Sequence, residues 1–243
     1  MGKDKLKRFD EVSRFENVLQ FPDGVSGNWH HEIFKNQNPI VLELACGRGE
    51  YTLGLAKLYP SNNYVGIDMK GARIWRGAKT ALESKLYHVR FLRIFIERIT
   101  TYFATNEVDE IWITFPDPHP PIAKAKKRLT SIRFLFEYKS FLKDGGIIHL
   151  KTDDKPLFDF TLHIIDLFGL EVLDLNHNVS LSFDDKPQLQ IITTYESRWR
   201  KEGKPIQYVA FRLEHDKLSS EKKQVAEATM LKWMTNYRDN GAN

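Results

Sequence analysis

Short apolar runs alternate with helical patterns through the middle of the chain. Each run is four to six residues long and ends at glycine, proline or polar residues, which predicts buried strands at 40–44, 64–67, 89–94, 111–115 and 147–150. Between the runs, apolar residues recur at helical spacing over 51–58, 71–87, 132–142 and 157–168. Because strands alternate with helices, we predict an α/β fold: a doubly wound, Rossmann-like sheet that is mostly parallel, with helices on both faces.

The last third of the chain is predicted to complete this sheet and add a tail. Segments 189–193 and 207–213 have extended patterns and are expected to form a late antiparallel strand pair. Residues 216–243 are expected to form a helical tail with four apolar residues on roughly one face: Leu218, Val225, Leu231 and Met234. That face either docks on the body or makes a dimer contact, so a monomer and a homodimer both stay open.

Charge and composition place limits on the setting. The 243 residues carry a formal net charge of +4, and residues 1–37 form a basic N-terminal extension that contains Lys3, Lys5 and Lys7. The first part of this extension is either a solvated end or an arm that touches nucleic acid phosphates. No repeat or linker interrupts the pattern, so we predict a single domain over 1–243.

Several classes of protein are excluded at this level. No apolar run approaches the roughly 18 residues of a membrane-spanning helix, and no secretory leader follows the first lysines. The single cysteine, Cys46, excludes an internal disulfide framework and a multi-cysteine metal site. We therefore expect a cytoplasmic protein that uses neither a membrane nor a metal ion.

A glycine turn follows the first predicted strand. Glu43 lies near the end of the apolar run, Gly47 and Gly49 open the next helix, and Asp68 ends the second strand about twenty residues later. Glycines let the backbone approach a ligand closely, and an acid at this spacing is typical of one that binds both ribose hydroxyls. The sequence therefore predicts a nucleoside-containing cofactor at this edge of the sheet.

Three ligand classes compete for the turn. A dinucleotide fingerprint needs a third glycine where Thr52 stands, and no P-loop motif is present. S-adenosylmethionine has no phosphate and carries a sulfonium and an amino group. Glu43 would repel a pyrophosphate but balances this cationic end, so the turn favours S-adenosylmethionine.

A proline-rich loop, 114–121, follows the fourth strand on the same edge. Its prolines stiffen the loop and fix Asp117, whose carboxylate is suited to orient a planar nitrogen base through N–H groups. Four basic residues follow directly and predict a phosphate-binding patch for nucleic acid: Lys124, Lys126, Lys127 and Arg128. Asp153 after the fifth strand, and Thr193 and Glu196 further on, carry weaker polar signals at strand ends.

Together these motifs resemble the bacterial tRNA (guanine-N7-)-methyltransferase family over about residues 38–213. The most specific parts are Phe115-Pro116-Asp117-Pro118, the basic segment that ends at Thr130, residues 149–153, and Thr193 with Tyr195-Glu196. The resemblance implies methyl transfer from S-adenosylmethionine to N7 of a guanosine in the variable loop of tRNA.

The resemblance also implies residue roles. Glu43, Asp68 and Asp117 would line the cofactor and target site, while Asp153, Thr193 and Glu196 would meet the guanosine. The family usually has an Asn-Asp-Ala-like triplet after the third strand, where this chain has Phe95, Ile96 and Glu97. Either Glu97 or backbone groups would therefore meet the adenine.

The site is expected to accelerate methyl transfer mainly by aligning the methyl donor with guanine N7. Guanine N7 has an in-plane lone pair and no proton to lose, so no general base is needed and Asp117 is the catalytic candidate. Two other interpretations stay open: a methyltransferase that acts on an exocyclic amine of DNA or on a protein side chain, and a non-catalytic RNA-binding module.

Overall fold

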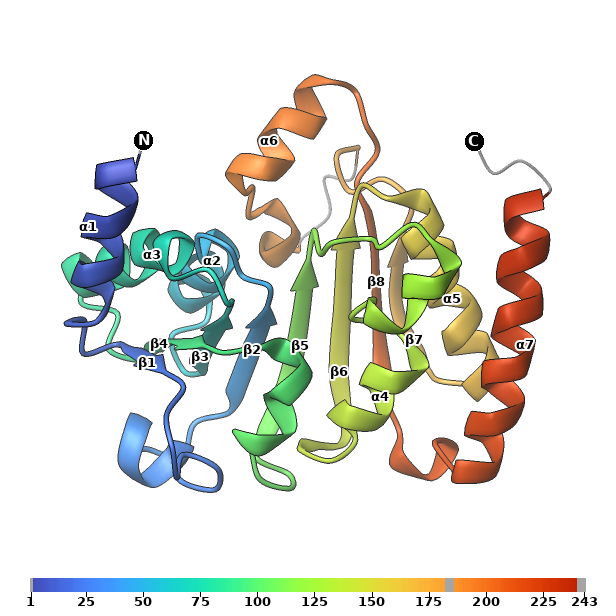
Figure 1. Ribbon diagram of the computed structural model, residues 1–243, viewed down its shortest axis with the longest axis horizontal. Coiled ribbons are helices and arrows are strands. Elements are labelled where there is room, and N and C mark those ends of the chain that lie inside the picture. The colour runs from blue at the N-terminus through green and yellow to red at the C-terminus, as the bar shows by residue number, and fades with distance from the viewer. Residues whose placement is uncertain (1, 182–185, 240–243) are drawn as a thin grey trace.

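The computed structural model describes residues 2–181 and 186–239, with side chains from Leu6 onward. An eight-stranded sheet runs through this part of the chain, in the order β1-β4-β3-β2-β5-β6-β8-β7 (Figure 1). Its strands are β1 (Val18–Gln20), β2 (Ile40–Leu44), β3 (Asn63–Ile67), β4 (Val89–Arg93), β5 (Val108–Thr114), β6 (Leu142–Thr152), β7 (Val172–Asn176) and β8 (Gln207–Leu213). Only β8 pairs antiparallel, with both β6 and β7, which confirms the predicted mostly parallel sheet with a late antiparallel pair.

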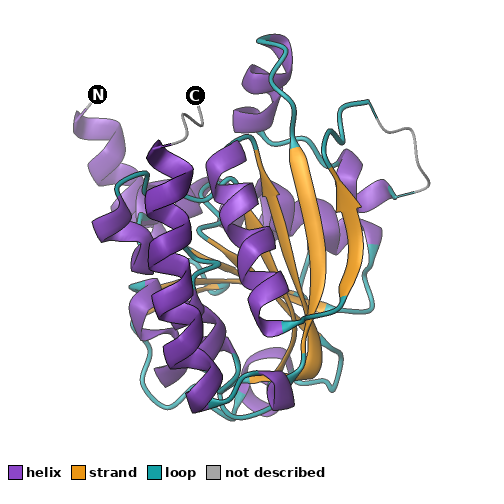
Figure 2. Ribbon diagram, turned by 90° about the vertical axis from the view of Figure 1, so that its right-hand side faces the viewer, coloured by secondary structure: helices purple, strands orange, loops and turns teal. Residues whose placement is uncertain are grey.

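Helices cover both faces of the sheet (Figures 1 and 2), and they bury the central strands on both sides. One apolar core lies under α2 (Glu50–Leu58) and α3 (Gly71–Glu83). The other lies under α4 (Ile132–Tyr138), α5 (Lys155–Phe168) and α7 (Ser220–Asp239). The predicted helices are therefore present, although α3 and α4 end four residues earlier than expected.

The predicted strand at 189–193 is wrong. A short 3-10 helix, η4 (Pro187–Gln190), stands there, and the partner of β8 is β7. The carbonyls of Leu189 and Ile191 accept hydrogen bonds from the buried ammonium of Lys151, which holds this apolar run without a neighbouring strand. β7 is an edge strand with no buried side chain, so its apolar pattern is weak.

The tail docks on the body as far as the described residues go. Trp233 of α7 stacks on His163 of α5 at 4.9 Å between ring centroids, and the hydroxyl of Tyr237 donates to Asp159 at 2.5 Å. The predicted apolar face is confirmed at Leu218, which is buried, and at Met234, which packs against the core. It is wrong at Val225 and Leu231, which are 68% and 57% exposed. Ala226 and Met230 are buried instead. Residues 240–243 of the predicted tail lie outside the description.

The N-terminal residues are folded onto the body. α1 (Gly2–Val12) packs on α3, with the indole of Trp75 donating to Glu11 at 2.6 Å, and β1 extends the sheet beside β4. Trp29 opens a π-helix, η1 (Trp29–Phe34), and is completely buried. The side chains of Lys3 and Lys5 lie outside the description. Within the described residues, no helix is long and apolar enough to cross a membrane.

Candidate active site

The site lies where the sheet changes its winding direction. From β2 the chain moves outward to β3 and β4 on one side, whereas β5 and β6 lie on the other. At such a switch point the loops at the carboxyl ends of the strands separate and leave a crevice for a ligand. The glycine turn after β2, Asp68 after β3 and the proline-rich loop after β5 all meet at this crevice.

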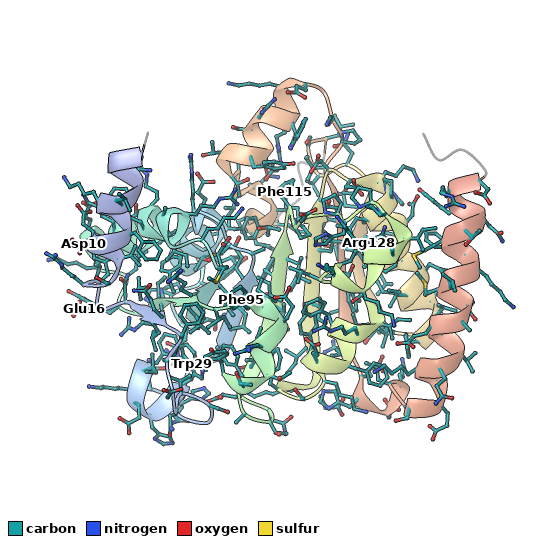
Figure 3. All side chains as sticks on the ribbon, viewed as in Figure 1. Asp10, Glu16, Trp29, Phe95, Phe115 and Arg128 are labelled. Atoms are coloured by element: carbon teal, nitrogen blue, oxygen red, sulfur yellow. The ribbon has the colours of Figure 1, made fainter. Side chains whose placement is uncertain are left out.

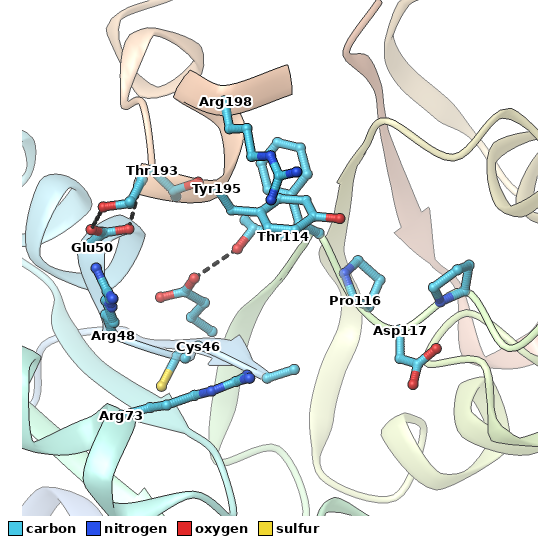
Figure 4. Close-up of a pocket in the computed structure, with 16 residues that line it drawn as sticks. Cys46, Arg48, Glu50, Arg73, Thr114, Pro116, Asp117, Thr193, Tyr195 and Arg198 are labelled. Carbon is cyan, nitrogen blue, oxygen red and sulfur yellow. Dashed lines mark hydrogen bonds between the residues drawn. The ribbon is translucent and has the colours of Figure 1, made fainter. Parts of the chain in front are cut away.

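Two neighbouring cavities open there. The larger, of about 610 Å³, extends from the glycine turn to the proline-rich loop and to α6 (Thr194–Lys201) (Figure 4). The smaller, of about 270 Å³, lies over Asp68 and the start of η2 (Ile96–Thr101). Ala45 and Asp117 line both cavities. Asp117 therefore stands at the junction between two compartments, where two bound groups would meet.

The two glycines of the turn have different physical roles. Both have left-handed backbone, with φ of 56° at Gly47 and 67° at Gly49. A Cβ on Gly49 would lie 2.5 Å from the ring of Phe91, so this glycine is required for packing. A Cβ on Gly47 would meet nothing closer than the carbonyl of Ala45 at 4.0 Å, and Gly47 lines the larger cavity. The open space in front of Gly47 is where a ligand can approach the backbone.

Glu43 is a buried carboxylate at the back of the larger cavity. It accepts hydrogen bonds from the backbone N–H of Thr52 at 2.8 Å and from the Thr52 hydroxyl. It also accepts one from the Thr114 hydroxyl at 2.7 Å, the dashed line at Thr114 in Figure 4. Burial raises the pKa of Glu43 from 4.5 to about 7, despite these hydrogen bonds. A cation in the cavity would favour the ionised form of this carboxylate.

Asp68 is held in a fixed orientation in the smaller cavity. One oxygen accepts the backbone N–H of Gly47 at 3.0 Å and the other accepts that of Lys70 at 2.7 Å. Phe95, Ile96 and Glu97 line the same cavity. The structure therefore brings Asp68, the predicted ribose acid, and the segment that holds Glu97 into one compartment, where either Glu97 or the backbone of this segment is available to the adenine.

The thiol of Cys46 faces the larger cavity but is unreactive. Burial, together with the charges of Glu43 and Asp68, raises the pKa of Cys46 well above its usual value. The thiol therefore stays protonated and acts as a small apolar group in the turn.

Arg128 holds the proline-rich loop from behind. Its guanidinium donates to the carbonyls of Pro118 at 3.1 Å, and of His119 and Pro120 at 3.3 Å each. Arg128 is only 6% exposed, and Figure 3 shows it to the right of Phe115, on the side towards α7. The prediction of a phosphate contact for Arg128 does not fit this geometry, since its donors are directed into the protein.

The loop presents Asp117 to the outside. The Asp117 side chain is 73% exposed, and its carboxylate accepts a hydrogen bond from the backbone N–H of His119 at 3.2 Å. Phe115 precedes it with a left-handed φ of 48°, a strained backbone for a bulky residue. Strain of this kind is typical of sites where a side chain must be aimed, and here it turns the chain into the crevice.

The three predicted lysines lie on η3 (Ile122–Lys127) and are all exposed. Lys127 lines the smaller cavity, whereas Lys126 lines a groove between η3 and α7. Lys124 lies on the same short helix. They form an exposed basic flank on the η3 side of the crevice, which we call the lysine flank.

A buried ion pair fixes the start of α6, which forms one wall of the larger cavity. The ammonium of Lys151 donates to Glu196 at 2.8 Å, and both side chains are completely buried. Arg200 reaches the other oxygen of Glu196 at 2.7 Å. Burial lowers the pKa of Lys151, an effect that the charge of Glu196 partly offsets. Both oxygens of Glu196 are engaged, so its predicted contact with guanosine does not fit this arrangement.

The start of α6 is fixed at a second point. Glu50 at the start of α2 accepts hydrogen bonds from the backbone N–H of Thr194, at 2.8 Å, and from its hydroxyl (Figure 4). Thr193 caps the helix by accepting the N–H of Glu196 at 3.0 Å, and it lines the larger cavity. The predicted substrate position of Thr193 therefore lies at the cavity wall, in a residue that also has a structural role.

Asp153 follows β6 and is partly buried. It is not among the residues that line the larger cavity, and burial raises its pKa. Two aromatic rings that the sequence motifs did not assign, Phe115 and Tyr195, do line the cavity, 5.4 Å apart. Tyr195 is 49% exposed, so its ring is available to a planar ligand.

Other cavity residues were missed because only the fold assembles them. Arg48 and Arg73 line the larger cavity from the glycine turn and from α3. Lys151 offered a signal, since a lysine within an apolar strand is expected only with a buried partner. Within the described residues, no cluster of His, Cys, Asp and Glu is placed to hold a metal ion.

Comparisons with known proteins agree with this geometry. A family model described as "Putative methyltransferase" matches residues 37–209. A protein of Christiangramia forsetii named tRNA (guanine-N(7)-)-methyltransferase is 48% identical, covering 87% of this chain and 99% of that protein. The chain belongs to the tRNA (guanine-N7-)-methyltransferase family. A Bacteroides fragilis member with the same name is 45% identical over 88% of this chain and 87% of that protein.

The fold of this family member is also found in solved structures. The 16S rRNA methyltransferase KamB superposes with a TM-score of 0.61 at 13% identity, covering 82% of this chain and 99% of that chain. At this identity the likeness supports the Rossmann-like methyltransferase fold alone.

Proposed function

We propose that this protein transfers a methyl group from S-adenosylmethionine to N7 of a guanosine in the variable loop of tRNA. The observation that supports this most directly is the position of Asp117, which lines both the compartment over Asp68 and the larger cavity. A donor that extends from Asp68 to Glu43 and a base held in the larger cavity would both lie next to this carboxylate.

The residues present fit S-adenosylmethionine. Asp68 is oriented by two backbone N–H groups and suits the ribose hydroxyls. Gly47 leaves open space for the body of the molecule, and Glu43 offers a carboxylate that a cation would ionise. When bound, this group supplies an activated methyl on a sulfonium.

The target base needs a flat, polar-edged site. Single-stranded loop nucleotides can be splayed out and stacked on aromatic rings. We place the guanine beside Tyr195, with its N1 and N2 hydrogens donated to Asp117. Holding that edge directs N7, on the opposite edge, across the larger cavity towards the glycine turn.

The protein then contributes alignment and charge. N7 carries no proton, so no side chain has to remove one before attack. Holding two reactants in a near-attack arrangement can contribute about 7–11 kcal/mol. The methylated guanine is cationic, and the carboxylate of Asp117 stabilises this developing charge.

The experiment that tests the proposal is methyl transfer to a tRNA transcript followed by chemical cleavage at 7-methylguanosine. We expect one cleavage, at a guanosine in the variable loop. The matched control is the same transcript with that guanosine replaced by adenosine, which should give none. Labelled methyl on another nucleotide, or on protein, would replace this proposal with another methyltransferase activity; no binding of S-adenosylmethionine would indicate a non-catalytic module.

A further inference from the structure

An arginine-lined pocket lies beside the larger cavity, and the site described above assigns no role to it. It has a volume of about 320 Å³, and four arginines line it together with Trp75: Arg8, Arg48, Arg73 and Arg76. We call it the arginine pocket. Three separate parts of the chain build it, namely α1, the glycine turn and α3.

These arginines carry charge that the described protein does not neutralise. None of the four guanidiniums takes part in an ion pair or hydrogen bond among the described side chains, and all four are exposed. By contrast, arginines elsewhere, such as Arg133 and Arg212, have a carboxylate within 2.9 Å. Like charges gathered without counter-charges raise the local potential and favour an anionic partner.

Packing holds the pocket in place. The guanidinium of Arg8 lies 5.0 Å from the centre of the Trp75 ring, and that of Arg76 lies 6.0 Å from it. The indole N–H of Trp75 donates to Glu11, which ties α1 to α3. Arg8 is therefore brought to the pocket by the docking of the N-terminal helix.

The pocket continues into the site. Arg48 and Arg73 line the larger cavity as well as the arginine pocket. Figure 4 shows these two side chains on one side of the cavity, with Asp117 on the other. The lysine flank follows Asp117 along the chain, so the mouth of the cavity has basic groups on both sides.

We propose that the arginine pocket binds backbone phosphates of the RNA on the α1–α3 side of the target nucleotide. Guanidiniums are suited to this because their planar donors match phosphate oxygens in pairs. The RNA strand then crosses the cavity from the arginine pocket to the lysine flank, and one nucleotide between them enters. This proposal rests on the proposed function, because it takes tRNA as the partner.

The test uses the two arginines that line the arginine pocket but not the larger cavity. In R8Q/R76Q, two phosphate contacts are lost, so the logarithmic salt dependence of tRNA binding should become shallower by roughly 1.4–1.8. The ratio of variant to wild-type Kd should then shrink about tenfold between 50 and 200 mM salt. The matched control K57Q/K85Q removes the same charge at Lys57, in the last turn of α2, and at Lys85, just after α3, and should keep the wild-type slope.

Further measurements make the outcome decisive. R8K/R76K should retain most of the slope, and Kd for S-adenosylmethionine and the melting temperature should be unchanged in all variants. A wild-type slope in R8Q/R76Q, a shift no larger than in K57Q/K85Q, or a joint loss of S-adenosylmethionine binding would each overturn the proposal. If the wild type methylates tRNA but R8Q/R76Q keeps the wild-type salt slope of tRNA binding, only the phosphate-binding role of the arginine pocket is refuted. If R8Q/R76Q shows the expected slope change but the wild type does not methylate tRNA, only the proposed function is refuted.

Discussion

Replacing Glu43 by glutamine isolates the consequence of burying a carboxylate behind the cofactor cavity. Glutamine has nearly the same shape. Its amide oxygen can accept the two hydrogen bonds from Thr52, and its amide nitrogen can donate to the hydroxyl of Thr114, which then acts as acceptor. The exchange therefore removes a titratable group while it retains the hydrogen-bond network.

The size of the effect follows from the pKa. The pKa of Glu43 is 4.5 when unfolded and about 7 in the folded protein, because burial disfavours the charged form. Between these values the folded protein holds a proton that the unfolded chain has released. Wild-type stability therefore falls as pH rises through this window, by about 1.4 kcal/mol per pH unit and about 3 kcal/mol in total. Glu43→Gln lacks this loss.

The assay is urea unfolding at constant ionic strength between pH 5 and pH 8, without cofactor. Other groups titrate in both proteins, so the quantity to follow is the free energy of unfolding of the variant minus that of the wild type. We expect this difference to rise by about 2.5 kcal/mol from pH 5 to pH 8, because pH 5 already lies inside the window. The exposed Glu83→Gln serves as control and should stay within about 0.5 kcal/mol.

The same carboxylate couples to the cofactor. A cationic ligand in the larger cavity favours ionised Glu43, so wild-type affinity for S-adenosylmethionine should rise with pH up to about 7 more steeply than that of Glu43→Gln. A pH-independent stability difference would refute the raised pKa. If the stability difference depends on pH as expected but the affinity for S-adenosylmethionine changes with pH equally in both proteins, the role of Glu43 opposite the cation would be refuted.

Three further substitutions test the rest of the site. Lys151→Met should lose about 3–5 kcal/mol of stability in urea unfolding, because Glu196 is left buried with one partner fewer. Adding Glu196→Gln should recover part of this loss, and additive losses would refute the coupling of the two side chains. Asp117→Asn should lower kcat about 10²–10³-fold without lowering the melting temperature, since the side chain is exposed; wild-type turnover would refute its role. Gly49→Ala should lower the melting temperature more than Gly47→Ala does. Gly47→Ala should weaken S-adenosylmethionine binding, measured by calorimetry, more than Gly49→Ala does. The reverse order in both measurements would contradict the assigned roles.

Much of the fold and part of the site could be predicted because the signals are local and periodic. Buried parallel strands appear as apolar runs, and residues at their carboxyl ends converge whatever the details of packing. Gly47, Asp68 and Asp117 each lie within three residues of the end of such a run, and each lines one or both of the two cavities. The edge strand β7 was missed because an edge strand need not bury a continuous apolar face.

The direction of a polar side chain was not predictable from position alone. Arg128 and Lys127 are neighbours in one basic run, yet Arg128 donates to three loop carbonyls inside the protein while Lys127 is exposed at the smaller cavity. Glu196 was likewise expected to face a substrate and instead pairs with Lys151. Whether such a group supports the site or touches a ligand depends on what the other chain segments bring against it.

Some side chains of the site contact a ligand, and others hold its loops in place. This difference bears on how the reaction is accelerated. If no proton has to move before attack on N7, the protein lowers the barrier through placement, and placement depends on whatever keeps the walls of the site rigid. Arg128 fixes the proline-rich loop from within, and Lys151 fixes the segment that leads into α6. Both are charged groups buried at an energetic cost, which is consistent with a need for fixed loops rather than for stability. Substitutions in this supporting layer should therefore lower kcat as strongly as substitutions that remove a contact with the substrate, whereas in a site driven by acid–base chemistry the groups that exchange protons would dominate.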